Sequence, residues 1–134
     1  MIHQKDLRLG DLVQITEDLL EYKQGDTFVV IDISEDYIGL RSPDKSDGRP
    51  DMYTIGDHIE GIPLTPEILE KNGWNKGRLY FTHSRIPRIK LCTDEDETKW
   101  SVLINGDIMG DYIFHVHQLQ HILFAFRIEE EMEV

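Results

Sequence analysis

The chain has 134 residues, 40% of them hydrophobic, which suits one compact domain or two very small subdomains around a shared core. Its 14 basic and 26 acidic residues give a formal charge of −12, which disfavours contact with phosphate backbones and anionic membranes over most of the surface. A single cysteine excludes an intramolecular disulfide. The opening residues contain no signal-peptide core, and the longest apolar run is too short to span a bilayer, so we expect a soluble, cytoplasmic protein without a membrane partner.

Residues 1–62 carry short apolar runs separated by turn residues. The segments 11–15, 27–33, 37–42 and 52–62 are predicted strands, because they alternate in polarity or are rich in β-branched residues. The last of them is interrupted by a glycine, and a polar loop with two prolines precedes it. Four or five short strands at this spacing predict a small, SH3-like antiparallel β-barrel as the first subdomain.

A short helix is predicted at the start of the second half. Thr65 suits its N-cap, Pro66 its first helical position, and Gly73 its end. After this helix the pattern returns to a period of two. Three antiparallel strands are therefore expected, at 77–83, 87–93 and 99–104.

The chain is predicted to close with a second helix, from His115 to Phe126, and an acidic tail that frays. Residues 63–134 thus form a helix-βββ-helix subdomain. We expect it to pack on the first subdomain, because the connection is short and apolar at Ile62 and Leu64. The predicted fold class is α+β: an N-terminal small SH3-like barrel, then a helix, a three-stranded antiparallel sheet and a C-terminal helix.

Three histidines lie in the last helical segment, "HVHQLQHILFAF". On a helix, His117 and His121 fall on the polar side, and their i, i+4 spacing suits two ligands of one Zn²⁺. No cysteine pair or HExxH arrangement supplies the remaining ligands. We therefore expect that the protein binds neither a metal ion nor another cofactor. The weak candidates for metal ligands are His117 and His121. The opposite, apolar stripe consists of Val116, Leu119, Leu123 and Phe126.

The sequence contains no recognisable catalytic arrangement. Cys92 lies in a β pattern without the local signature of an activated thiol. Ser84 follows His83, but adjacent side chains of a strand point to opposite faces. Neither a nucleophile elbow nor a glycine-rich phosphate loop occurs. We therefore predict that the protein is not an enzyme and has no catalytic residues.

Residues 71–93 run against the overall charge, with six basic residues and no acid. Basic residues interleaved with exposed aromatic rings can follow a phosphate backbone and stack on bases. The alternation of side chains along a strand should bury several of these rings, which argues against stacking on bases. Nucleic-acid binding is therefore the alternative hypothesis and not the first one. The basic residues are Lys71, Lys76, Arg78, Arg85, Arg88 and Lys90, and the interleaved rings are Trp74, Tyr80, Phe81 and His83.

Three segments carry a resemblance to a known family: "DLRLGDLV", "GIPLTPEILEKNGW" and "FHVHQLQHILFAF". In this order and spacing the chain resembles a family of short, uncharacterised phage- or prophage-associated proteins of gut bacteria. Its members typically start with "LRIGN", carry a "PIPLTEEWLLKFGF"-like helix and end with "YVHQLQNLYFALTG". The chain departs from that pattern at His121, where the family has asparagine, and in its acidic end. The resemblance implies a phage-linked, intracellular protein and no particular activity.

Taken together, these features predict a non-catalytic protein-interaction module. The alternative is a nucleic-acid-binding accessory protein that uses the basic and aromatic segment 71–93. The partner is expected to be another protein or a second copy of the chain, with nucleic acid as the alternative. The candidate partner-binding residues are Phe124, Gln120, Trp74, Arg78 and Arg88.

Overall fold

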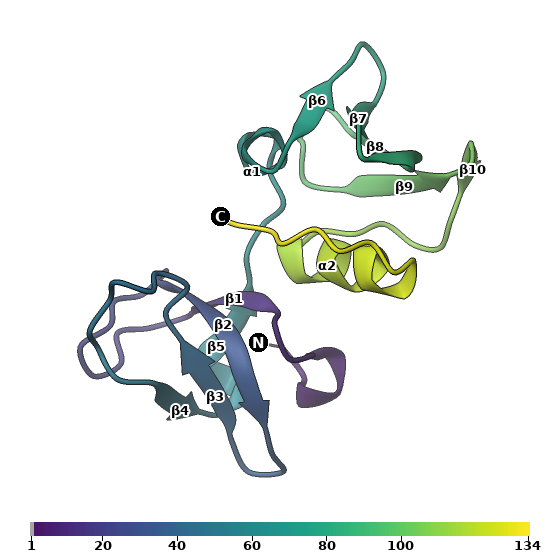
Figure 1. Cartoon of the computed structure of the whole chain (residues 1–134). Helices are drawn as coiled ribbons and strands as arrows, with labels where there is room; N and C mark the ends of the chain where they lie inside the picture. The colour runs from purple at the N-terminus through teal and green to yellow at the C-terminus, as the bar shows by residue number, and fades with distance from the viewer. Residues whose placement is uncertain (1) are drawn as a thin grey trace. The chain divides into compact units, whose positions relative to one another are not determined.

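The computed structural model describes residues 2–134, and the chain divides into two compact units, the first ending at Ile62 and the second beginning at Pro63 (Figure 1). Each unit is built on one five-stranded antiparallel sheet. Among the described residues only one helix has seven or more residues, so the protein is mostly β. The α+β class predicted from the sequence is therefore wrong.

The strands of the first unit are β1 (Leu12–Ile15), β2 (Thr27–Ile33), β3 (Ile38–Arg41), β4 (Met52–Thr54) and β5 (Ile59–Gly61). Their order in the sheet is β4-β3-β2-β1-β5, and all neighbours are antiparallel. One 3₁₀ turn, Gln4–Asp6, precedes the sheet, and another, Gly56–His58, separates its last two strands.

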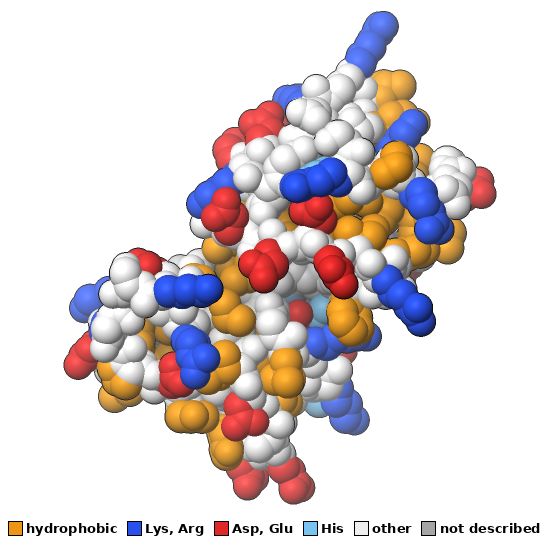
Figure 2. All heavy atoms as spheres, in the orientation of Figure 1, with side chains coloured by type: hydrophobic (Ala, Val, Ile, Leu, Met, Phe, Trp, Pro, Cys, Tyr) orange, Lys and Arg blue, Asp and Glu red, His pale blue; other side chains and the backbone are white. Residues whose placement is uncertain are grey.

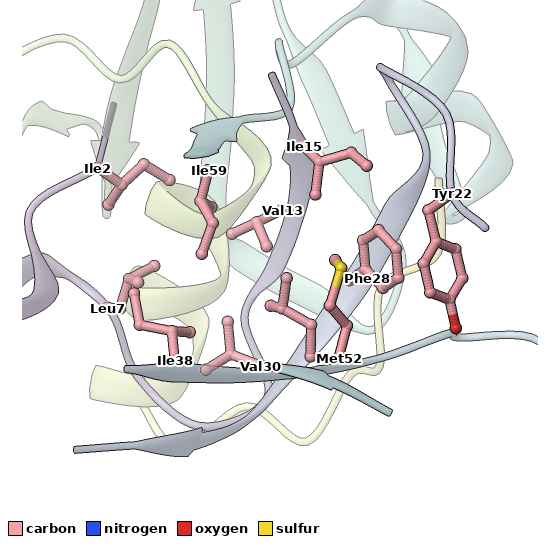
Figure 3. Close-up of a cluster of buried hydrophobic side chains, with 11 residues drawn as sticks. Ile2, Leu7, Val13, Ile15, Tyr22, Phe28, Val30, Ile38, Met52 and Ile59 are labelled. Carbon is pink, nitrogen blue, oxygen red and sulfur yellow. The ribbon is translucent and has the colours of Figure 1, made fainter. Parts of the chain in front are cut away.

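The core of the first unit is a cluster of apolar side chains contributed by all five strands and by the segments that flank them (Figure 3). On β2, Phe28 and Val30 are buried and alternate with half-buried neighbours, as the period of two of a strand requires. Tyr22 packs edge-to-face on Phe28, with ring centroids 4.8 Å apart. The Tyr22 hydroxyl donates to the backbone oxygen of Pro50 at 2.6 Å, which ties the polar loop before β4 to this core.

The predicted SH3-like barrel is wrong because this sheet stays open. A closed barrel needs its two outer strands to pair, so that no edge remains. β5 pairs with β1, whereas β4 pairs with β3. Among the described residues no pairing joins β4 to β5, and the turn Gly56–His58 carries the chain from one outer strand to the other.

The second unit contains the helices α1 (Pro66–Lys71) and α2 (Val116–Ala125) and the strands β6 (Trp74–Lys76), β7 (Phe81–His83), β8 (Ile86–Thr93), β9 (Trp100–Ile104) and β10 (Asp107–Ile108). The strand order β10-β9-β8-β7-β6 makes an antiparallel meander. The predicted three-stranded sheet is wrong. The expected strand 77–83 begins with a turn, in which the Gly77 N–H donates to the Tyr80 oxygen, and β6 and β10 extend the sheet at both edges.

α1 begins and ends where the sequence predicts. The Thr65 hydroxyl accepts a hydrogen bond from the Ile68 N–H at 3.2 Å, and Pro66 occupies the first turn. Gly73 follows the helix at φ +89°, in the left-handed region that glycine adopts at little cost. A Cβ at Gly73 would also lie 2.7 Å from Nε2 of His83, so no larger residue fits there.

α2 ends in a Schellman motif that reverses the chain. The Ile128 N–H donates to the Leu123 oxygen and the Arg127 N–H to the Phe124 oxygen, each at 2.9 Å. Arg127 itself adopts φ +56°. The tail then returns past α2 towards α1 (Figure 1), where hydrogen bonds hold it. The tail that was predicted to fray therefore contacts the rest of the second unit.

We expect Arg127→Gly to stabilise the protein by about 0.5–1 kcal/mol and to raise Tm in a thermal melt. A left-handed residue other than glycine costs roughly 1–2 kcal/mol, and the entropy of glycine in the unfolded chain offsets part of the gain. Ala125→Gly is the matched control, because Ala125 is the last residue of α2 and is not at positive φ, so glycine there should lower Tm. A fall in Tm for both variants would contradict the strain assigned to Arg127.

Candidate functional site

Strand pairing gives the sheet of the second unit two faces. Phe81, Leu91 and Val102 stand opposite one another on β7, β8 and β9, and all three are buried. Paired residues of antiparallel strands point to the same side, so this row defines the inner face. Trp100 is also fully buried, and its indole Nε1 donates to the Leu64 oxygen at 2.9 Å.

The neighbouring cross-strand row points to the opposite side of the sheet. Thr82 pairs with Lys90, Lys90 with Leu103, and Leu103 with Ile108. Ile108 is 70% exposed, and Leu103 beside it is half-buried. Two apolar side chains and a lysine therefore lie next to one another on a side of the sheet that is open to solvent.

Two tyrosines lie beside this row. The Lys90 ammonium is 5.4 Å from the centroid of the Tyr80 ring, and the Lys99 ammonium is 5.8 Å from that of Tyr112. Tyr112 is 57% exposed and precedes Ile113, which is buried and exchanges two backbone hydrogen bonds with β9. We call the whole set the outer face: Tyr80, Thr82, Lys90, Leu103, Ile108 and Tyr112.

Positive charge accompanies the apolar side chains of the outer face. Within the part of the chain that the structure describes, Lys90 forms no salt bridge, and it lies over the Tyr80 ring as a cation–π contact. Where β8 to β10 lie, Figure 2 shows hydrophobic side chains at the surface beside Lys and Arg side chains. An apolar surface with an unpaired ammonium suits a partner that offers apolar groups and carboxylates.

The acidic hairpin tip between β8 and β9 has its own local structure. Burial raises the pKa of Asp94, but hydrogen bonds from the backbone N–H groups of Thr98 and Lys99 outweigh it and hold the pKa below its ordinary value. The Thr98 bond measures 3.2 Å. Asp94 therefore acts as a turn-forming anion.

The histidines around α2 do not meet the requirements of a zinc site. The ring centroids of His117 and His121 are 5.6 Å apart, and those of His115 and His117 are also 5.6 Å apart. Among residues 2–134, however, no group of three or more His, Cys, Asp or Glu side chains is placed to hold a metal ion. Zinc needs three or four protein ligands, so the pair His117 and His121 is incomplete.

The buried side of α2 is wider than the sequence predicts. Val116, Leu119 and Leu123 are buried as their spacing requires, and Phe126 is half-buried. The His117 side chain is only 6% exposed, so the prediction that it lies on the polar side of the helix is wrong.

Gln118 has a capping role that the sequence prediction missed. Its side-chain oxygen accepts hydrogen bonds from the N–H groups of Phe114 and His115 at 2.7 and 3.0 Å. This contact is half of a capping box, for which a glutamine three residues after the N-cap is the sequence signal.

The predicted partner-binding residues lie in different environments. Phe124 is 72% exposed and Gln120 is half-buried on α2, and their role in binding stays a prediction. Trp74 is buried, and its ring packs edge-to-face on His83 with centroids 5.4 Å apart. The prediction that Trp74 contacts a partner is wrong, because strand alternation on β6 turns its ring inward.

The predicted basic segment does not form one patch. Lys71 and Arg85 contact the C-terminal tail, and the Arg88 guanidinium lies 5.5 Å from the centroid of the Phe126 ring. Arg78 is exposed in the turn between β6 and β7. Lys90 lies on the outer face, and Lys76 is exposed on β6, opposite Phe81. The six basic side chains therefore lie in several separate places.

His83, which the sequence suggested only as one of the interleaved rings, is a structural residue. It is buried, its Nδ1 accepts a hydrogen bond from the Arg85 N–H, and its Nε2 lies 3.1 Å from the Asn72 oxygen. This pattern requires the neutral tautomer with the proton on Nε2. The imidazole therefore ties the end of α1 to the β7–β8 turn and is not exposed for acid–base chemistry.

No helix among the described residues is both long and apolar enough to cross a bilayer. No family model, no curated protein and no solved structure matches this chain.

Proposed function

We propose that the protein is a non-catalytic protein-interaction module that binds its partner through the outer face of the second sheet. The observation that carries this proposal is the cross-strand row Lys90–Leu103–Ile108, together with the exposed Tyr112 in the segment that pairs with β9. We further propose that the partner is a protein surface with apolar groups and carboxylates.

The physical argument rests on exposed apolar area and charge. Ile108 and Tyr112 leave most of their surfaces in water, where apolar area costs roughly 25 cal/mol per Å² relative to burial. Aromatic side chains are enriched at protein interfaces, and clustered exposed apolar groups often mark them. The Lys90 ammonium favours a partner carboxylate beside this apolar surface, which adds specificity.

Single-stranded nucleic acid is the second candidate, because tyrosines and lysines on a sheet can also stack bases and follow phosphates. The net charge of −12 opposes it. Titration of labelled DNA and RNA oligonucleotides at low salt should show little binding. Tight, salt-sensitive binding that is lost in Lys76→Glu, Arg78→Glu and Lys90→Glu would favour the nucleic-acid function instead.

Photo-cross-linking tests the protein-binding proposal. A photoreactive residue placed at Ile108 should give discrete protein adducts in a cell extract, and Lys90→Glu should remove them. The matched position is Glu95, in the exposed tip between β8 and β9, where no such adducts are expected. Identical adducts from both positions, or none from position 108, would contradict binding through the outer face.

We also propose that the module acts in the cytoplasm and is phage-associated. This part rests on the resemblance carried by segments such as "VHQLQ" and on the acidic, polar composition. The genes beside its own test it: a phage or prophage neighbourhood is expected, and an isolated housekeeping context would contradict it.

A further inference from the structure

The C-terminal tail is held by the side chain of one asparagine. Asn72 Nδ2 donates to the backbone oxygen of Glu133 at 2.7 Å, and the Glu133 N–H donates to Asn72 Oδ1 at 2.8 Å. Asn72 Nδ2 also donates to the Ile68 oxygen at 2.7 Å, so both amide protons are used. The Asn72 amide thus pairs with the backbone of the tail as a neighbouring strand would. Every residue except proline offers both of the backbone groups that this contact uses.

Two cations flank this contact. Arg85 Nε lies 3.1 Å from a carboxylate oxygen of Glu130, and Lys71 Nζ donates to the Val134 oxygen at 2.8 Å. We call Lys71, Asn72 and Arg85 the tail cradle. Its three members come from the end of α1 and the β7–β8 turn, which His83 ties together.

The side chains of the tail alternate in burial along the chain, as they do in an extended peptide. Ile128, Glu130, Met132 and Val134 are half-buried, whereas the three glutamates between them are exposed. Alternate side chains therefore face the protein, as in a strand that binds at a sheet edge. The bound segment is acidic, and the cradle supplies a lysine and an arginine for it.

We infer that the tail cradle is a recognition site for an extended acidic segment of a partner protein, and that the chain's own tail occupies it as an intramolecular competitor. The contacts to Asn72 use only backbone atoms, so another peptide with a carboxylate for Arg85 and alternating apolar groups satisfies the same site. The site is separate from the outer face, and it does not depend on the binding proposed there.

Tethering makes the tail a strong competitor. The tail is joined directly to α2 through the turn at Arg127, so it stays close to the cradle and its effective concentration there is high. A free peptide therefore binds in proportion to the fraction of molecules whose tail is undocked. Releasing the tail should therefore raise the affinity for a free peptide by roughly tenfold or more, if the tail is docked at least about nine-tenths of the time.

The experiment uses the full-length chain and a labelled peptide with the sequence of residues 127–134, followed by fluorescence polarisation. In the release variant, Glu130→Arg repels Arg85 and Glu133→Pro removes the N–H that binds Asn72. Its matched control carries Glu129→Arg and Glu131→Pro, at exposed positions of the same tail. We expect tight peptide binding by the release variant alone, and its loss when Asn72→Asp is added.

Equal, weak binding by the folded release variant and its control would overturn the inference, and the tail would then be a fixed part of the second unit. A second measurement avoids variants altogether. Hydrogen exchange of the Glu133 amide in the natural chain should accelerate when millimolar unlabelled peptide is added, because the peptide displaces the tail. An unchanged exchange rate at saturating peptide would overturn the inference independently.

Discussion

Leu119→Ala is expected to destabilise the protein by about 2–5 kcal/mol, because it empties a fully buried site in the middle of α2. Small domains have total stabilities of roughly 5–15 kcal/mol, so this loss should lower Tm strongly. Neighbouring positions Val116 and Leu123 are also buried, so the helix presents a continuous apolar stripe that one truncation interrupts. Thermal melts followed by circular dichroism measure the effect.

Leu79→Ala is the matched control, since it makes the same chemical change at a leucine that is 69% exposed in the turn between β6 and β7. Its Tm should stay close to that of the natural chain. Equal melting temperatures for the two alanine variants would mean that α2 does not contribute its apolar stripe to the folded core.

The second large effect is expected for Trp100→Ala, which should cost about 3–5 kcal/mol. Trp100 is fully buried, packs edge-to-face on Phe81 with centroids 5.4 Å apart, and donates its indole N–H to Leu64. Trp100→Phe should cost less than Trp100→Ala, because it keeps an aromatic ring and loses mainly the hydrogen bond, at about 1–3 kcal/mol for the unpaired oxygen. Urea unfolding at equilibrium gives all of these values.

Tyr112→Ala provides the comparison on the opposite side of the sheet. Tyr112 is exposed, so its truncation should change the free energy of unfolding by less than about 1 kcal/mol. If Trp100→Ala and Tyr112→Ala were equally destabilising, the assignment of an inner and an outer face would be contradicted.

Local chemistry explains which elements the sequence predicted. The bounds of α1 follow from Thr65, Pro66 and Gly73, each of which acts through its own backbone or the next turn. β2 occupies the predicted residues 27–33, because a long β-branched run leaves little alternative. These signals need no knowledge of distant contacts.

The number of predicted strands does not determine whether a sheet closes into a barrel or how many strands it finally contains. Both depend on contacts between segments that are distant in the sequence. Whether β4 meets β5 is decided by the path of the chain through residues 55–58, and the strand pattern is the same in an open sheet and a barrel. β10 has only two residues, and it exists because Asn105 and Gly106 both adopt positive φ, which makes a tight hairpin. An Asn-Gly pair is a sequence signal for a hairpin turn, but the two-residue strand that follows it here is too short to predict from the sequence.

The candidate surfaces were harder to predict, because both depend on register or distance. The outer face requires the pairing of Lys90 with Leu103, and a bulge between Thr82 and His83 shifts the register on the neighbouring strand. The contact between Asn72 and Glu133 joins residues 61 positions apart. No local pattern predicts such a pair.

The central claim, that the outer face binds a protein, is tested most directly by quantitative affinity enrichment from a cell extract. Three baits are compared: the natural chain, Ile108→Asp on the outer face, and Leu79→Asp at an exposed position outside it. We predict that a defined set of proteins is enriched equally on the natural chain and Leu79→Asp and falls at least several-fold on Ile108→Asp, with all three baits folded. The same enrichment on all three baits would contradict the claim.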